Sequence, residues 1–161
     1  MRRRVRLWIV VTGLVVLHFL LHVGLGVGRQ APDLLTVALL LLSRDVRAGA
    51  AAGAGLFFGL LEDAMTVLSF GANAVAMTLV GGLGALTRDL FVGDSLVFFV
   101  SYFMIGKWIR DLAHWLMMGD VIRPSFVDAV LVAAPLASLY ASGAAVVVIA
   151  VSGLWGESPG R

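Results

Sequence analysis

The chain of 161 residues is 60% hydrophobic and only 14% charged, with a mean hydropathy of +1.00. A soluble domain of this length does not need so much apolar surface, and there is no room beside the apolar runs for a separate catalytic domain of ordinary size. The net charge is +2, and the sequence shows no cluster of basic residues that would form a nucleic-acid-binding patch. The absence of cysteine excludes disulfides and thiolate metal sites.

Apolar runs of about 20 residues predict transmembrane helices. We expect an all-α, polytopic membrane protein, a single integral membrane domain over residues 1–161, with six spans. Their ranges are about 5–27, 31–42, 48–70, 72–86, 95–118 and 126–151. The first could be a signal peptide, but it is longer than usual and no small-residue cleavage site follows. The second is short, and we expect it to begin at Ala31-Pro32-Asp33, because proline suits a first helical turn.

Arginine positions predict the orientation. With the N-terminus inside and six spans, most arginines fall on the cytoplasmic side and few fall outside, so both termini are expected in the cytoplasm. The inside set is Arg2, Arg3, Arg4, Arg6, Arg44, Arg47, Arg88 and Arg161, and the outside set is Arg29 and Arg123.

Two adjacent acids, Glu62 and Asp63, lie near the end of the run at 48–70. Acids are costly in a membrane unless they face a bundle interior or partner, or lie near the interface. Neighbouring helical positions diverge by about 100°, so the two cannot point to one spot. Either Asp63 faces inward to cap or pair with a polar group, or both acids are solvated at the outer interface. We expect Asp33 and Asn73, at outer turns, to meet near Asp63.

The fifth expected helix carries a polar stripe, because Lys107, Arg110, Asp111 and His114 recur at three- and four-residue spacing. One interpretation is snorkelling of long side chains to lipid head groups beside a tryptophan belt. The other is a charged groove for a partner helix, a lipid head group or a lipid-linked substrate. Arg110 and Asp111 cannot both face lipid near the midplane at acceptable cost.

Glycines at four-residue spacing, Gly49 with Gly53 and Gly55 with Gly59, predict close helix contacts. Packing within this protein is favoured over a face for a partner. His18 and His22 share a helix face but lack a third ligand, so we expect no metal and no cofactor. A proton relay would need a continuous chain of acids and histidines, and the sequence has none. An intramembrane enzyme would need a nucleophile–base pair, and the sequence places none.

Five short motifs follow one another in the chain: Pro32-Asp33-Leu34, the basic loop Arg44 to Arg47, Gly59 to Asp63, Gly71-Ala72-Asn73 and Leu79-Val80-Gly81. In their order and spacing the chain resembles the MreD family, the rod shape-determining membrane proteins of bacteria. The resemblance covers residues 31 to about 86, and the flanking helices match only in hydropathy. Glu62 is a departure, because it adds a second acid beside the family's usual lone aspartate.

The resemblance implies a non-enzymatic scaffold subunit of the cell-elongation machinery in the bacterial cytoplasmic (inner) membrane. It would bind MreC, within a wider complex of MreB, RodA and a partner transpeptidase, and help organise peptidoglycan synthesis. Contacts with membrane lipids and a homodimer stay open. The family's fold is similar to substrate-binding subunits of energy-coupling-factor transporters, so a small-molecule-binding membrane subunit is the alternative. The residues expected in partner binding or assembly are Pro32, Asp33, Gly55, Gly59, Glu62, Asp63, Gly71, Asn73, Lys107, Arg110 and Asp111.

Overall fold

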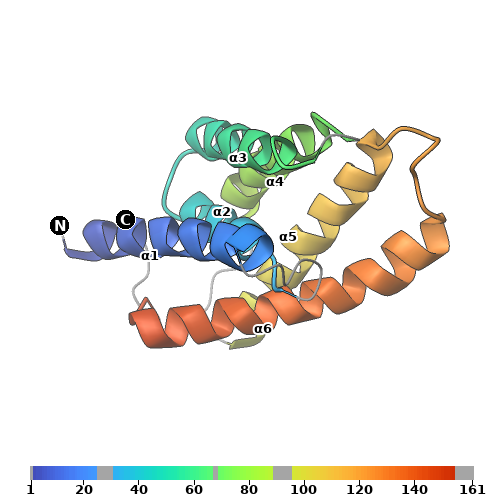
Figure 1. Cartoon of the computed structure of the whole chain (residues 1–161). Helices are drawn as coiled ribbons and strands as arrows, with labels where there is room; N and C mark the ends of the chain where they lie inside the picture. Colours follow the sequence, from blue (N-terminus) through green and yellow to red (C-terminus); the bar gives the residue numbers. More distant parts are fainter. Residues whose placement is uncertain (1, 25–30, 67–68, 89–95, 155–161) are drawn as a thin grey trace.

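The computed structural model describes residues 2–24, 31–66, 69–88 and 96–154. Within these ranges the chain forms six α-helices and no strand, which confirms the predicted all-α class (Figure 1). The helices are α1 (Arg2–Phe19), α2 (Leu34–Ser43), α3 (Ala48–Asp63), α4 (Ala72–Thr87), α5 (Leu96–Met117) and α6 (Ala134–Ser152). A π-helical segment, η1 (Leu20–Gly24), continues α1, and a second, η4 (Val127–Ala133), leads into α6.

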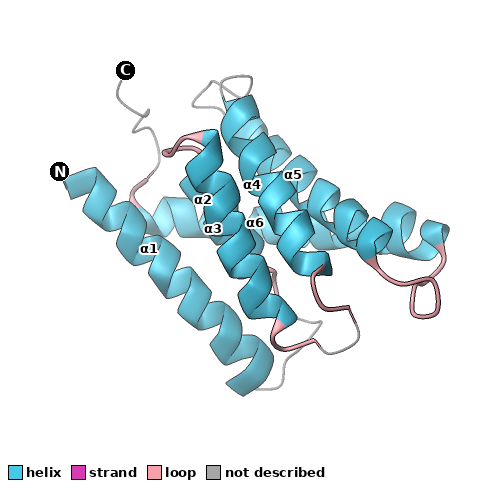
Figure 2. Ribbon diagram, turned by 90° about the horizontal axis from the view of Figure 1, so that it is seen from above, coloured by secondary structure: helices cyan, strands magenta, loops and turns pink. Residues whose placement is uncertain are grey.

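Helix α2 lies at the centre of the bundle, and the other five helices pack around it (Figures 1 and 2). All ten of its residues are buried. A helix that is apolar on every side is stable only when surrounded by protein or lipid. The prediction of a short second helix is confirmed, since ten residues extend only about 15 Å.

One end of the bundle gathers arginines from several helices. Arg3 pairs with Asp45 in the turn between α2 and α3, and Arg6 donates from Nη1 to the carbonyl of Gly153, 3.1 Å away. The start of α1 therefore lies beside the α2–α3 turn and the end of α6. We call this region the arginine end. It comprises Arg3, Arg6, Arg44 and Arg88.

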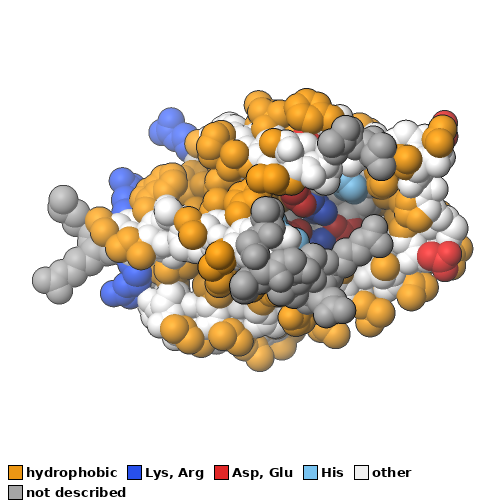
Figure 3. Space-filling model, viewed as in Figure 1, with side chains coloured by type: hydrophobic (Ala, Val, Ile, Leu, Met, Phe, Trp, Pro, Cys, Tyr) orange, Lys and Arg blue, Asp and Glu red, His pale blue; other side chains and the backbone are white. Residues whose placement is uncertain are grey.

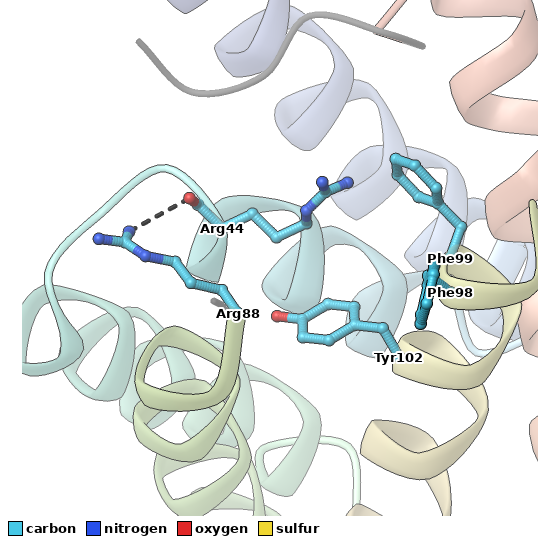
Figure 4. A pocket seen from close by; sticks show the side chains of 5 residues that line it. All are labelled: Arg44, Arg88, Phe98, Phe99 and Tyr102. Carbon is cyan, nitrogen blue, oxygen red and sulfur yellow. Dashed lines mark hydrogen bonds between the residues drawn. The ribbon is translucent and has the colours of Figure 1, made fainter. Parts of the chain in front are cut away.

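Figure 4 shows how α4 and α5 join the arginine end. Arg88 donates from Nη1 to the carbonyls of Arg44 and Val46, at 3.2 and 2.9 Å. The guanidinium carbon of Arg44 lies 4.3 Å from the ring centroid of Phe99, a cation–π contact. The end of α4, the α2–α3 turn and the first turns of α5 therefore meet at the same end.

Helices α3 and α4 pack with their backbones in contact. A Cβ atom at Gly55 would overlap the carbonyl of Met77, and one at Gly59 would overlap the Cα of Ala74. Small residues at such positions allow close approach. The favoured interpretation of this glycine pair as internal packing is therefore confirmed, and α4 covers the face that Gly55 and Gly59 form.

For the other glycine pair on α3, Gly49 and Gly53, the prediction of close helix contacts within this protein is wrong. A Cβ atom at Gly49 or Gly53 would have no neighbour within 4 Å, and both residues are exposed. The two pairs have the same spacing, so their different surroundings come from the direction in which each faces on the helix.

Two predicted helix boundaries are wrong. Helix α3 ends at Asp63 rather than near residue 70, because the carboxylate of Asp63 caps the next helix and the chain must turn back there. Helix α2 starts at Leu34 rather than at Ala31-Pro32-Asp33, because Asp33 is its N-cap and an N-cap has non-helical backbone angles. The predicted end of the first span, residues 25–27, lies outside the described residues.

By length and composition, two helical stretches in the described residues could cross a membrane: Arg3–His22 and Val127–Ser152. Helices α2 and α4 are apolar but shorter. Helix α5 has 22 residues, but its second half carries the charged stripe.

Candidate functional site

The carboxylate of Asp63 caps the start of α4. Its Oδ2 accepts from the backbone N–H groups of Gly71 and Ala74, both at 2.9 Å, and its Oδ1 accepts from that of Asn73 at 3.2 Å. The first N–H groups of a helix have no partner within the helix, and the helix dipole favours an anion there. Gly71 has φ of +92°, which favours glycine. Of the two interpretations left open by the sequence, the one in which Asp63 faces inward to cap a polar group is confirmed.

Glu62 faces a different helix. Arg110 of α5 donates from Nη2 to Oε1 of Glu62 and to Oδ1 of Asn73, both at 2.7 Å. The divergence of about 100° between neighbouring helical residues explains the division, since Asp63 reaches α4 and Glu62 reaches α5. The interpretation in which both acids are solvated at the interface is therefore wrong.

The basic residues of the α5 stripe also face the bundle interior. Lys107 pairs with Asp111 and lies 3.4 Å from Oδ2 of Asp33. Arg110 lies 3.2 Å from Oδ1 of Asp111 through Nη1, and 4.0 Å from Oδ2 of Asp33 through Nε. Both basic residues are buried, so the snorkelling interpretation is wrong for them. Charges inside a membrane bundle are tolerated when they pair in this way.

Asp33 connects this network to α2. Its Oδ1 accepts from the backbone N–H of Thr36 at 2.9 Å, and its Oδ2 accepts from the hydroxyl of Thr36 at 2.7 Å. Pro32 precedes this cap and contributes a carbonyl to the N–H of Leu34 at 2.8 Å. Asp33 therefore orders the start of the central helix and takes part in ion pairs at the same time.

These contacts unite residues from α3, α4, α5 and the turn before α2. We call the set the charged cluster: Asp33, Glu62, Asp63, Asn73, Lys107, Arg110 and Asp111. In Figure 3 the face seen in Figure 1 is hollowed near its centre, and acidic, basic and histidine side chains show inside the hollow between α3 and α5. Asn73 meets Asp63 directly and Asp33 joins them through Arg110, so the expected proximity is confirmed.

His18 is a neighbour of the charged cluster that the sequence did not indicate. It is buried on α1 and interacts electrostatically with Asp33, Lys107 and Arg110. Its ring stacks on that of His22 at 4.1 Å between centroids, and Nδ1 of His22 lies 2.9 Å from the carbonyl of His18. No local signal relates α1 to α5, so only the packed structure could place His18 here.

Among the described residues, no group of three or more His, Cys, Asp or Glu side chains is arranged to hold a metal ion. A separate cavity of about 240 Å³ lies between α2, α4 and α5. Its lining is apolar except for Thr87 and Tyr102.

The structure therefore places most of the residues predicted for partner binding or assembly in or beside the charged cluster. Gly55 and Gly59 instead lie against α4. For all of these residues, a role in binding a partner stays a prediction. No protein-family model, no curated protein and no solved structure matches the chain.

Proposed function

We propose that this chain is a non-enzymatic scaffold subunit of the bacterial cell-elongation machinery, an MreD-type protein that binds MreC. The observation that carries the proposal is the convergence of the motifs on which the resemblance depends. Asp33, Asp63 and Asn73 come from three separate motifs, and they meet in one network of ion pairs and hydrogen bonds. Gly71 and Gly59 come from the same motifs and shape the α3–α4 pair that holds this network.

In this proposal all six helices belong to one membrane domain in the cytoplasmic membrane, with both termini inside. The arginine end supports this orientation, because cytoplasmic loops of membrane proteins are enriched in arginine and lysine. Arg3, Arg6, Arg44 and Arg88 approach this end from different parts of the chain. The inward direction of Lys107 and Arg110 agrees with a lipid environment around α5.

Binding is favoured over turnover because the charged groups engage one another. Arg110 contacts Glu62 and Asn73, and Lys107 contacts Asp111. Such a network holds α2, α3, α4 and α5 in a fixed arrangement, as a subunit that presents a surface to partners requires. MreC is the proposed direct partner, with MreB, RodA and its transpeptidase in the wider complex.

The cavity of about 240 Å³ favours a second candidate, a small-molecule-binding membrane subunit. A ligand site usually combines apolar walls with a few polar groups that fix orientation. Here the hydroxyl of Thr87 already donates to the carbonyl of Leu83 at 2.8 Å, and that of Tyr102 lies 3.2 Å from two backbone carbonyls. The lining therefore offers few polar groups to a ligand, and the scaffold is preferred.

The test is co-purification in mild detergent with the MreC-type protein of the same organism. We expect a stable complex with the wild-type chain and its loss with Asp63→Leu, because the substitution leaves the N-terminal N–H groups of α4 unpaired. Asp120→Leu is the matched control, since the side chain of Asp120 is 92% exposed and lies outside the charged cluster.

The control variant should retain the complex, and the helical circular dichroism of Asp63→Leu should show whether it still folds. A wild-type chain that binds no elongation protein, but retains a small molecule through purification, would contradict the scaffold and favour the second candidate.

A further inference from the structure

The cavity of about 240 Å³ is a groove between α4 and α5 that is partly open to the surface. Leu40 of α2 and Val80 of α4 line it and are buried, whereas Leu83 and Ile105 line it and are exposed. The groove therefore extends from the central helix to the side of the bundle. In the proposed membrane placement, this side faces lipid.

The groove runs lengthwise from the arginine end toward the middle of the bundle. It is lined by residues at three- and four-residue spacing within 80–87 of α4 and 102–109 of α5. The two helices are antiparallel, since Tyr102 meets Gly84 and Arg110 meets Asn73. Each stretch is about 10 Å long, and half of a hydrocarbon core is about 15 Å thick. The groove thus covers much of one leaflet.

The lining favours an apolar occupant. The hydroxyl of Thr87 donates to the carbonyl of Leu83 at 2.8 Å, and that of Tyr102 lies 3.2 Å from two backbone carbonyls. The polar side chains of the groove therefore have partners within the protein. A hydrocarbon chain needs no hydrogen bond, and a long space between two helices suits its shape.

Two arginines lie where the groove begins. Figure 4 shows Arg44, Arg88 and Tyr102 around a small pocket, and Tyr102 also lines the groove. Both arginines act electrostatically on Tyr102. Two backbone carbonyls hold Nη1 of Arg88, and the guanidinium of Arg44 lies over the ring of Phe99. We call Arg44 and Arg88 the arginine pair, and these contacts fix it beside the groove.

Charge is what would select one lipid from the others. Apolar contact alone does not, because the acyl chains of all lipids are equally apolar. Basic pockets between transmembrane helices on the cytoplasmic side bind anionic head groups. A guanidinium donates to a phosphate through two parallel N–H groups, which gives strong and directional bonds.

We infer that the arginine pair and the groove together bind an anionic phospholipid. Its phosphate lies at Arg44 and Arg88, and one acyl chain lies between α4 and α5. The inference rests on the membrane placement in the proposed function, and it does not depend on MreC.

The test uses the purified full chain in phosphatidylcholine vesicles that contain a trace of phosphatidylglycerol with a photoreactive diazirine in one acyl chain. We expect crosslinks at Leu83 and Ile105, located by mass spectrometry of peptides. Added unlabelled phosphatidylglycerol should prevent them, and added phosphatidylcholine should not. Leu139 on α6 is 57% exposed and is the internal control, because crosslinks there should not depend on which lipid is added.

Variants of the arginine pair test the selection by charge. Arg44→Gln should raise the phosphatidylglycerol concentration needed for competition about fivefold, because one attractive charge near the head group is lost. Arg44→Lys keeps the charge and should retain most of the preference. Arg123→Gln is the matched control, since Arg123 pairs with Asp120 in the turn after α5, far from the arginine end.

A variant of the groove tests the place of the acyl chain. Ile105→Trp should fill the groove and remove the crosslinks at Leu83 while both arginines stay. Leu139→Trp adds the same ring to the exposed face of α6, and it should leave the crosslinks at Leu83 unchanged.

Three results would overturn the inference. The first is equal competition by phosphatidylglycerol and phosphatidylcholine at Leu83 and Ile105, which needs no variant. The second is an unchanged preference in both Arg44→Gln and Arg88→Gln. The third is competition by inorganic phosphate as effective as that by the lipid, which would indicate a site for a free anion.

The proposed function fails in other ways. A chain that does not insert into the vesicles contradicts the membrane placement on which both rest. A chain that prefers phosphatidylglycerol but binds no MreC-type protein upholds the lipid site and contradicts the scaffold. A chain that binds the MreC-type protein without a lipid preference contradicts the lipid site alone. A retained phospholipid does not favour the second candidate, because lipid belongs to the surrounding bilayer.

Discussion

Arg110 links α5 to three other parts of the bundle. Its guanidinium bonds Glu62 of α3 and Asn73 of α4, and approaches Asp33 before α2. A planar guanidinium can hold several acceptors in fixed directions, which an ammonium cannot. The residue is therefore suited to fix the relative positions of the helices around it.

Replacement of Arg110 should reveal this role. Arg110→Leu leaves the carboxylates around it without their partner, and breaking a buried ion pair in this way costs about 3–5 kcal/mol. Arg110→Lys keeps the charge but loses the planar geometry, so we expect a smaller loss. Reversible unfolding in mixed detergent micelles measures both. A leucine variant as stable as the wild type would show that the network contributes little to folding.

The α3–α4 pair depends on two glycines, Gly55 and Gly59, that the sequence alone does not distinguish from the other glycines of α3. Gly59 lies against the backbone of Ala74, while Gly53 has open space. The backbone of Ala74 cannot move aside as a flexible side chain can, so there is no room at Gly59 for even one methyl group.

This difference predicts opposite effects of the same substitution on α3. Gly59→Ala should destabilise the protein by about 1–3 kcal/mol through overpacking. Gly53→Ala should be neutral or stabilise it by up to about 1 kcal/mol, because alanine has the higher helix propensity. The unfolding free energies of the two variants, measured in the same detergent, decide the point. Equal losses would mean that α3 and α4 are not in backbone contact.

Helix α2 shows the same dependence on its neighbours. It is buried along its whole length, and the hydroxyl of Tyr102 on α5 lies 3.2 Å from the carbonyls of Leu40 and Gly84. A ten-residue helix is marginal by itself in water. Its stability therefore comes from the helices around it and from the Asp33 cap at its start.

In the molecule as a whole, two groups of charged residues lie toward opposite ends of the bundle. Arginines gather at one end, and the charged cluster lies toward the other, where α3 ends and α4 begins. This arrangement suits a membrane protein whose arginine end faces the cytoplasm.

The orientation can be tested with single cysteines, because the chain contains none. Arg47 begins α3 at the arginine end and Asp120 lies in the turn after α5, and both are exposed. In spheroplasts, a membrane-impermeant thiol reagent should label Asp120→Cys and not Arg47→Cys. Inverted membrane vesicles should give the reverse. Labelling of both variants from one side would contradict the proposed orientation.

Local sequence patterns correctly predict the helical class, the six helices and the short second helix, because apolar runs set the helices. The predicted topology also places Asp33, Asn73 and Asp63 near turns at the same end of the bundle, but Arg110, which links Asp33 to Asn73, is known only from the packed structure. The predicted end of α3 was wrong because hydropathy alone does not show that Asp63 caps the next helix. The chain turns at this residue, and α3 ends earlier than its apolar run predicts.

Which face of each helix is covered depends on how distant segments pack together. Gly55 and Gly53 look alike in sequence, and so do Glu62 and Asp63, but a step of about 100° per residue sends neighbours to different helices. The inward direction of Lys107 and the approach of His18 likewise follow from contacts between distant segments. Local spacing shows which residues share a face, and packing alone shows what that face meets.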